Sequence, residues 1–130
     1  TADAAGAPDG DGDPTTLTVA MECAYAPYNW TQSDDSNGAV AIRGSSDYAY
    51  GYDVMMAKKI GEALGQQVQI VKLDWDSLIP AVMSGDVDCV IAGQSITAER
   101  AAQVDFSNPY YYASIVTLTK KDSAYADLLK

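Results

Sequence analysis

The feature that most constrains the fold of this chain is an alternation of two kinds of apolar pattern along its middle. Short apolar runs typical of buried strands occupy residues 17–23, 68–73 and 87–92. Segments typical of helices lie between and after them, over residues 54–64, 75–83 and 97–103. Strands that alternate with helices over short connections form a parallel sheet with helices on its faces. The sequence therefore predicts an α/β fold with a mainly parallel sheet.

Capping residues mark the ends of the helical segments. Asp53 and Thr97 precede helical segments, as N-caps do, and Gly65 and Gly85 follow helical segments, as C-caps do. These positions predict where the helical segments begin or end.

Two segments outside this alternation also carry a structural prediction. Residues 31–51 are polar and rich in glycine, with an Asn-Gly turn signal, so they are expected to form a long loop or a hairpin. Residues 110–119, YYYASIVTLT, are rich in aromatic and β-branched side chains. That composition predicts a further strand, with the tyrosines packing at its start.

Charge and residue content exclude several classes of function. The chain has 8 Lys plus Arg against 18 Asp plus Glu, a formal charge of −10, so nucleic acid is not an expected partner. It has no histidine, which excludes Ser-His-Asp and Cys-His nucleophile systems and His-ligated metal sites. No phosphate-binding loop motif occurs. We therefore expect no catalytic residue, no metal site and no cofactor.

The first residues differ in composition from the rest of the chain. Residues 1–14 hold four Asp, three Gly, two Pro and four Ala, and no large apolar side chain. Such a segment cannot offset the entropy lost on ordering, so residues 1–15 are expected to form a flexible acidic tail. The tail lacks the pattern of a signal peptide. It is either a spacer that follows a removed signal or a lipid-anchored N-terminus, or no more than the end of the expressed chain.

The candidate binding residues follow the first and third strands. Ligands of parallel sheets lie beyond the carboxyl ends of the strands, which here are residues 22–30 and 92–100. Arg100 falls in the first turn of a short helix, where a guanidinium and free backbone N–H groups suit a carboxylate. The alternative for Arg100 is a solvated surface arginine. Tyr25 and Trp75 are candidates for the walls of a pocket, with ordinary core packing as the alternative.

Other conspicuous residues have simpler structural explanations. Tyr28 lies in the same loop as Tyr25, and we expect it to pack in the core. Cys23 and Cys89 both fall in predicted strands. Neighbouring parallel strands seldom meet the geometry of a disulfide, so buried free thiols are the expectation.

Four segments are specific when they are taken in order. They read LTVAMECAYAPYNW, GYDVMMAKKIGEALG, DWDSLIPAVMSGDVDCVIAG and SITAERAAQVDFSNPYY. The ordered set, collinear over about residues 16–125, closely resembles the family 3 extracellular solute-binding proteins, the amino-acid receptors of ABC importers. The resemblance implies a periplasmic-binding-protein-like type II fold, in which two α/β lobes enclose an amino acid. It assigns residues 16–120 to the first lobe and residues 121–130 to the start of the crossover, with the second lobe absent from this sequence.

The resemblance also implies how the first lobe would hold the two charged ends of an amino acid. Arg100 would pair with the α-carboxylate through two hydrogen bonds, and Ser95 would add its hydroxyl or its backbone N–H. Ala92 and Gly93 would line the pocket, with the Gly93 carbonyl facing the ligand ammonium. Gln94 stands where the family more usually has an apolar residue.

The ligand side chain and the wider function follow from the same resemblance. Tyr25 and Trp75 would sandwich the ligand side chain, and Glu22 lies where the family often has an acidic residue near its distal end. The implied function is extracytoplasmic binding of a free amino acid for delivery to the membrane permease of an ABC importer. An enzyme of the same fold, such as a dehydratase, and a ligand-sensing domain of a signalling receptor are the alternatives. Self-association through residues 110–119 is a further expectation for a chain that carries one lobe.

Overall fold

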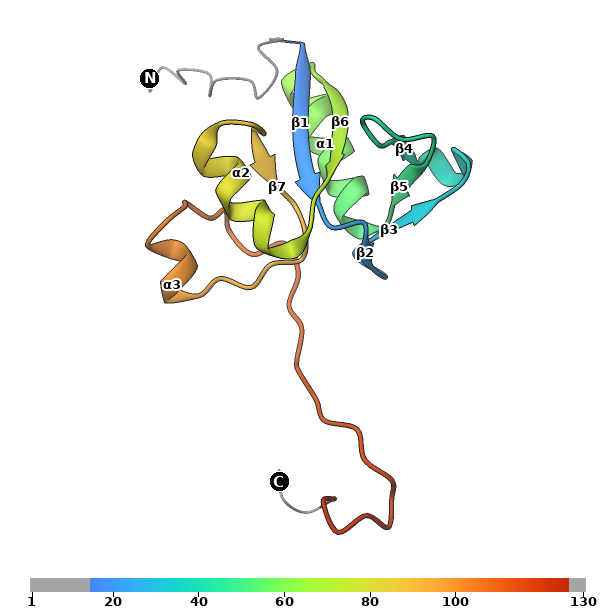
Figure 1. The fold of residues 1–130 in the computed structure, drawn as a ribbon, viewed down its shortest axis with the longest axis vertical. Helices are drawn as coiled ribbons and strands as arrows, with labels where there is room; N and C mark the ends of the chain where they lie inside the picture. Colours follow the sequence, from blue (N-terminus) through green and yellow to red (C-terminus); the bar gives the residue numbers. More distant parts are fainter. Residues whose placement is uncertain (1–14, 127–130) are drawn as a thin grey trace.

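A three-stranded parallel sheet forms the centre of the computed structural model, which describes residues 15–126 (Figure 1). Its strands are β1 (Thr16–Met21), β6 (Gln67–Lys72) and β7 (Cys89–Val90), in the order β6-β1-β7. Val19 of β1 pairs with Ile70 on one side and Cys89 on the other. A central parallel strand is covered on both faces, and β1 is accordingly buried from Leu17 to Met21. The predicted α/β fold with a parallel sheet is confirmed.

A second, antiparallel sheet stands where a long loop or a hairpin was expected. It comprises β2 (Ala24–Tyr25), β3 (Asn29–Gln32), β5 (Tyr48–Tyr50) and β4 (Val40–Ala41), in the order β2-β3-β5-β4. The hairpin of β3 and β5 encloses a 3-10 turn, η1 (Ser36–Gly38). Trp30 and Tyr50 face each other across it, with ring centroids 5.3 Å apart. Aromatic cross-strand pairs of this kind stabilise short hairpins.

The helices occupy the predicted segments with some changes at their ends. They are α1 (Tyr52–Leu64), η2 (Trp75–Ser77), α2 (Leu78–Ser84) and α3 (Ala98–Ala101). Gly65 and Gly85 are left-handed C-caps, as predicted. Thr97 caps α3, since its hydroxyl accepts a hydrogen bond from the Arg100 backbone N–H. The predicted helix at 75–83 divides into the 3-10 turn η2 and the α-helix α2.

The prediction that Asp53 caps α1 is wrong. The N-cap is Gly51, with φ of 129°, and Asp53 lies inside the first turn with its side chain fully buried. A side chain at position 51 would collide with the Tyr28 backbone, so glycine is required there. Asp53 therefore has a different role, which its buried partners define.

The predicted strand at residues 110–119 is also absent from the part of the chain that is described. These residues form an extended segment that leaves the body of the protein (Figure 1). Ile115, Val116 and Leu118 are exposed. High β-propensity produces a strand only when another strand offers its backbone, and none does so here. The expected tail at residues 1–15 lies outside the described residues, apart from Thr15, which is an exposed turn residue.

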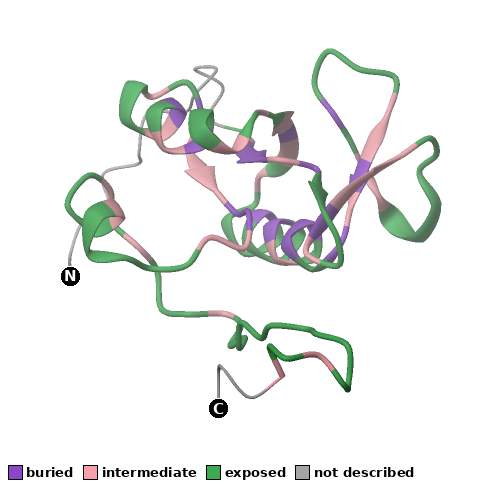
Figure 2. Ribbon diagram, turned by 60° about the horizontal axis from the view of Figure 1, so that its bottom comes forward, coloured by how far each residue is buried: buried purple, intermediate pink, exposed green. Residues whose placement is uncertain are grey.

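The hydrophobic core is formed by strands and helices from the whole alternating part of the chain. Buried residues lie on β1, β6, α1 and α2 (Figure 2), and the hydrophobic core includes Val19, Met21, Val54, Ile70 and Leu78. Most apolar side chains in this core come from elements that the sequence pattern predicted. Among residues 15–126, no helix is both long enough and apolar enough to cross a membrane. The core holds the carboxyl ends of β1 and β7 side by side, which places the candidate site.

Candidate functional site

A hollow of about 330 Å³ lies where β1 and β7 end. Six residues line it, and all six were predicted as ligand-binding residues: Glu22, Tyr25, Trp75, Gly93, Ser95 and Arg100. Glu22 directly follows β1, and Gly93 follows β7 by three residues. The hollow therefore occupies the position that a parallel sheet favours for ligands.

Ala92 is the one predicted site residue that does not line this hollow. Its side chain is 2% exposed and belongs to the hydrophobic core. The chain passes from core to site between Ala92 and Gly93, since Gly93 lines the hollow and Ala92 does not.

Arg100 is fixed by two local contacts. Its guanidinium Nη1 donates to the Ser95 carbonyl at 3.0 Å, and its Cζ lies 5.6 Å from the centroid of the Trp75 ring. The first contact ties α3 to the loop before it, and the second is a cation–π contact. Within the described residues, only one of the five guanidinium N–H groups has a protein acceptor. Arg100 is thus oriented in the hollow with donors to spare for an anion.

The aromatic wall is made of Tyr25 and Trp75. The two rings meet edge to face with centroids 6.4 Å apart, and Tyr25 is 42% exposed. Trp75 is half-buried and also packs against the core, so it both lines the hollow and contributes to core packing. Tyr28, expected in the core, is half-buried and packs its ring on Tyr25 at 4.9 Å.

Glu22 and Arg100 bring opposite charges to one small hollow. A ligand with both a carboxylate and a cationic group matches such a site, because each of its charges meets an opposite one. The described residues contain no group of three or more His, Cys, Asp or Glu side chains that could hold a metal ion. The chemistry available to this hollow is therefore ion pairing, hydrogen bonding and contact with aromatic faces.

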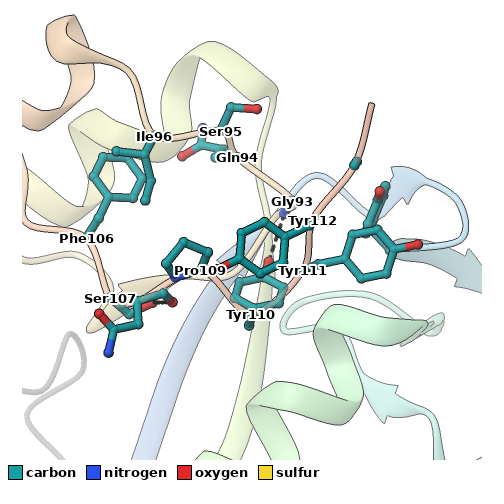
Figure 3. Close-up of a pocket in the computed structure, with 13 residues that line it drawn as sticks. Gly93, Gln94, Ser95, Ile96, Phe106, Ser107, Pro109, Tyr110, Tyr111 and Tyr112 are labelled. Atoms are coloured by element: carbon teal, nitrogen blue, oxygen red, sulfur yellow. Dashed lines mark hydrogen bonds between the residues drawn. The ribbon is translucent and has the colours of Figure 1, made fainter. Parts of the chain in front are cut away.

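A second hollow, of about 310 Å³, adjoins the first and is shown in Figure 3. It shares Gly93 and Ser95 with the first hollow, and residues 106–113 also line it. Tyr110 also lines this second hollow, and its hydroxyl accepts a hydrogen bond from the Gly93 N–H at 3.2 Å (Figure 3). Sequence reasoning placed Tyr110 at the start of a strand and did not connect it with the site.

A buried carboxylate lies behind this contact. The Tyr110 hydroxyl donates to Asp53 Oδ1 at 2.7 Å, and the Asn29 amide donates to Asp53 Oδ2 at 2.8 Å. Burial raises the pKa of Asp53, while the bonds from Tyr110 and Asn29 act in the opposite direction. Burial, and after it the neighbouring Asp53, raise the pKa of Tyr110. Asn29 and Asp53 are polar residues beside apolar ones in the sequence, and that contrast is the sequence signal for this hydrogen-bond network.

The two cysteines are free, as expected. Burial raises the pKa of the Cys23 thiol to about 11 and that of the Cys89 thiol to about 11. Both thiols are therefore protonated at neutral pH. The expected burial is found for Cys23, whereas Cys89 is half-buried.

Comparison with known proteins finds relatives of this chain. The chain is 32% identical over 112 residues to the arginine-binding extracellular protein ArtP of Bacillus subtilis, covering 86% of this chain and 39% of that protein. It is 35% identical over 115 residues to a probable histidine-binding protein of Neisseria gonorrhoeae, covering 86% of this chain and 38% of that protein. The chain thus spans less than two fifths of the length of these relatives.

Solved structures show which part is matched. The arginine-bound form of domain 1 from TmArgBP superposes with a TM-score of 0.61 and 33% identity, over 75% of this chain and 68% of that chain. An ancestral arginine-binding protein bound to arginine gives a TM-score of 0.61 and 40% identity, over 75% of this chain and 38% of that chain. The fold is therefore that of a first lobe, as expected.

The family itself follows from a match over most of the chain. Residues 17–126 match the bacterial extracellular solute-binding proteins, family 3. This is a family of binding proteins and not of enzymes, which agrees with the expectation that the chain has no catalytic role. The chain belongs to the bacterial extracellular solute-binding proteins, family 3.

Proposed function

We propose that this chain is the first lobe of a receptor that binds a free amino acid outside the cytoplasm and delivers it to the permease of an ABC importer. The observation that carries the proposal is the hollow at the strand ends. It is lined by two opposite charges, Glu22 and Arg100, and by the aromatic side chains of Tyr25 and Trp75. An amino acid carries a carboxylate and an ammonium on one carbon, and in this proposal Arg100 meets the carboxylate and the Gly93 carbonyl faces the ammonium. The proposed lobe comprises residues 16–120, with residues 121–130 beginning the crossover to a second lobe.

Each lining residue has a role in this proposal. Arg100 pairs with the ligand α-carboxylate, and Ser95 adds a hydrogen bond to the same end. Gly93 contributes backbone to the floor. A bidentate bond between a guanidinium and a carboxylate is among the strongest polar contacts in proteins, and Arg100 retains the donors for it.

The remaining residues favour a ligand with a cationic side chain. Tyr25 and Trp75 offer aromatic surfaces, which attract cations, and Glu22 supplies a negative charge in the same hollow. The names of several relatives support this choice, since they are called arginine-binding or histidine-binding proteins. The class of ligand proposed for this chain is therefore a basic amino acid, with L-arginine as the first to test.

The test is a calorimetric titration of the 130-residue chain with L-arginine, L-histidine and L-glutamate. Domain 1 of a relative has been crystallised in an arginine-bound form, so a single lobe is a suitable subject for binding. We expect L-arginine to bind and L-glutamate not to bind, because a second carboxylate would face Glu22.

Arg100→Ala should then weaken arginine binding about tenfold or more, because it removes a charged hydrogen-bonding partner. The matched control is Arg43→Ala, since Arg43 is exposed and lies outside the hollow. Equal affinity of the wild-type chain and Arg100→Ala would remove Arg100 from the site. If none of the three amino acids binds to the chain, the proposed function of this lobe is contradicted.

A further inference from the structure

One buried carboxylate connects the two strand ends that border the hollow. Asp53 is fully buried and accepts one hydrogen bond on each oxygen, from Tyr110 at 2.7 Å and from Asn29 at 2.8 Å. Beyond these partners, the Tyr110 hydroxyl accepts from the Gly93 N–H at 3.2 Å, and Asn29 Oδ1 accepts from the Cys23 N–H at 2.7 Å. The network thus begins next to Glu22, at the end of β1, and finishes at Gly93, after β7.

We propose that Tyr110 and Asp53 are positioning residues, which hold the Gly93 turn and the residues after β1 in the arrangement that binds the ligand. This inference rests on the proposed function, because it concerns the same hollow. Neither Tyr110 nor Asp53 lines that hollow. Both act through the backbone of residues that border it.

The Gly93 turn has little freedom to move without disturbing the aromatic wall. Gly93 has φ of 63°, in the left-handed region that favours glycine. A Cβ at this position would lie 3.2 Å from the Tyr25 ring and 3.3 Å from the Tyr28 ring. The backbone of Gly93 is therefore in close contact with Tyr25, one of the two rings that wall the hollow. A shift of the turn would change the space available to a ligand beside that ring.

The Tyr110 hydroxyl suits this role because it acts as donor and acceptor at once. It donates to Asp53 and accepts from Gly93, and a phenol can do both only while it keeps its proton. Its ring is held independently, stacked on Tyr52 with centroids 6.0 Å apart. Removal of the hydroxyl alone should therefore free the Gly93 N–H without removing the ring.

The experiment compares Tyr110→Phe with the wild-type 130-residue chain. The first measurement is made without ligand, by ¹H–¹⁵N NMR of the glycine amides. We expect the Gly93 resonance to shift and its N–H to exchange with solvent about tenfold faster, because its acceptor is gone. The amides of Gly65 and Gly85, which cap α1 and α2, serve as internal references that should stay in place. Tyr112→Phe is the matched control, since Tyr112 is 85% exposed.

The second measurement is the affinity for L-arginine. We expect Tyr110→Phe to bind about fivefold to tenfold more weakly, and Tyr112→Phe to bind as the wild type does. A variant whose glycine references also move has lost its fold more generally, which would contradict a specific positioning role. Asp53→Asn provides a second variant, because its amide can accept from only one of the two donors, and it should move the same Gly93 resonance.

The outcomes separate this inference from the proposed function. If the wild-type chain binds arginine and Tyr110→Phe binds it equally well, the positioning role is wrong and the function stands. If the Gly93 resonance is unchanged in Tyr110→Phe, the hydrogen bond does not hold the turn and the inference is overturned, whatever the affinity. If the wild-type chain binds no amino acid, the function fails, and a role in ligand positioning fails with it.

Discussion

The two sides of the hollow are built in opposite ways. The side formed by Tyr25 and Gly93 is backed by the buried network of Asp53, Asn29 and Tyr110, which we call the anchored side. The side formed by Ser95 and Arg100 stands on an exposed loop and the four-residue helix α3, which we call the open side. Its hydrogen bonds join residues no more than five positions apart in the sequence.

This difference separates two tasks of a binding site. Shape depends on backbone that does not move, and buried, fully paired polar groups supply such rigidity. Affinity for a charged ligand depends on a group that is accessible and still has free donors, and the half-buried Arg100 is such a group. Substitutions that leave buried groups of the anchored side unpaired should therefore lower stability as well as affinity, and those on the open side, such as Arg100→Ala, should lower mainly affinity.

The largest expected effect is on the stability of the anchored side. Asp53→Ala leaves the Tyr110 hydroxyl and the Asn29 amide without their acceptor, and each unpaired buried group costs about 1–3 kcal/mol. We expect the free energy of unfolding to fall by about 2–5 kcal/mol in urea titrations. Asp35→Ala, at an exposed carboxylate, should change it by less than about 0.5 kcal/mol. Equal stabilities for the two variants would show that the anchored side is not anchored by Asp53.

The next largest effect is expected on the reactivity of the Cys23 thiol, which tests how often the anchored side opens. Cys23 belongs to that side, and its thiol has a pKa of about 11 against 9.0 for an unperturbed thiol. At pH 8 the folded thiol should thus react with a disulfide reagent about a hundredfold more slowly than the thiol of the urea-unfolded chain. Cys89→Ser isolates the Cys23 signal, and Cys23→Ser provides the complementary measurement.

The sign of the pH dependence follows from the same raised pKa. The contribution of neutral Cys23 to stability is fully present below pH 9.0 and is lost as the pH rises through about 11. Reaction of Cys23 at the unfolded rate at pH 8 would mean that the anchored side is open much of the time.

A smaller effect is expected at Trp75, which touches both sides. Its ring meets Tyr25 at 6.4 Å and Arg100 at 5.6 Å. Trp75→Ala should weaken arginine binding about fivefold and lower the free energy of unfolding by about 1–2 kcal/mol, because it removes both a ligand contact and a half-buried ring. Trp30→Ala, in the β3–β5 hairpin, should lower stability and leave affinity unchanged. If Trp75→Ala behaves in the same way as Trp30→Ala, Trp75 is a core residue and not part of the site.

The smallest effect concerns the segment that follows Tyr110. Ile115, Val116 and Leu118 are exposed on an unpaired extended stretch, and such stretches tend to pair with other strands. We expect weak, concentration-dependent self-association in sedimentation velocity, reduced by Val116→Lys and unaffected by Ser45→Lys in an exposed turn. Arginine affinity should be the same at all chain concentrations. A concentration-dependent affinity would mean that association reaches the hollow and that its two sides are not complete within one chain.

Local pattern accounts for most of what was predicted correctly. The apolar runs at 17–23 and 68–73 form the paired strands β1 and β6, and the glycines at 65 and 85 end their helices. Six of the seven predicted site residues line one hollow because they follow strand ends, which meet at one edge of a parallel sheet. Periodicity, caps and the order of elements suffice for the strands, the helix ends and the edge of the sheet, whereas Glu22 and Gly93 were assigned to the site by the family resemblance.

Three features were decided only by contacts between distant segments. Residues 110–119 have the composition of a strand but no neighbouring backbone to pair with. Asp53 has the position of a helix cap, yet burial joins it to Asn29 and Tyr110, 24 and 57 residues away. Ala92 and Gly93 are adjacent in sequence, and only packing puts one in the core and the other in the hollow. The sequence by itself thus determined the strands of the parallel sheet, the helices beside it and the edge of the sheet where the site lies, because these follow from local pattern. The tertiary structure decided which polar side chains are buried together, because a buried hydrogen bond requires partners that meet only after the chain has folded.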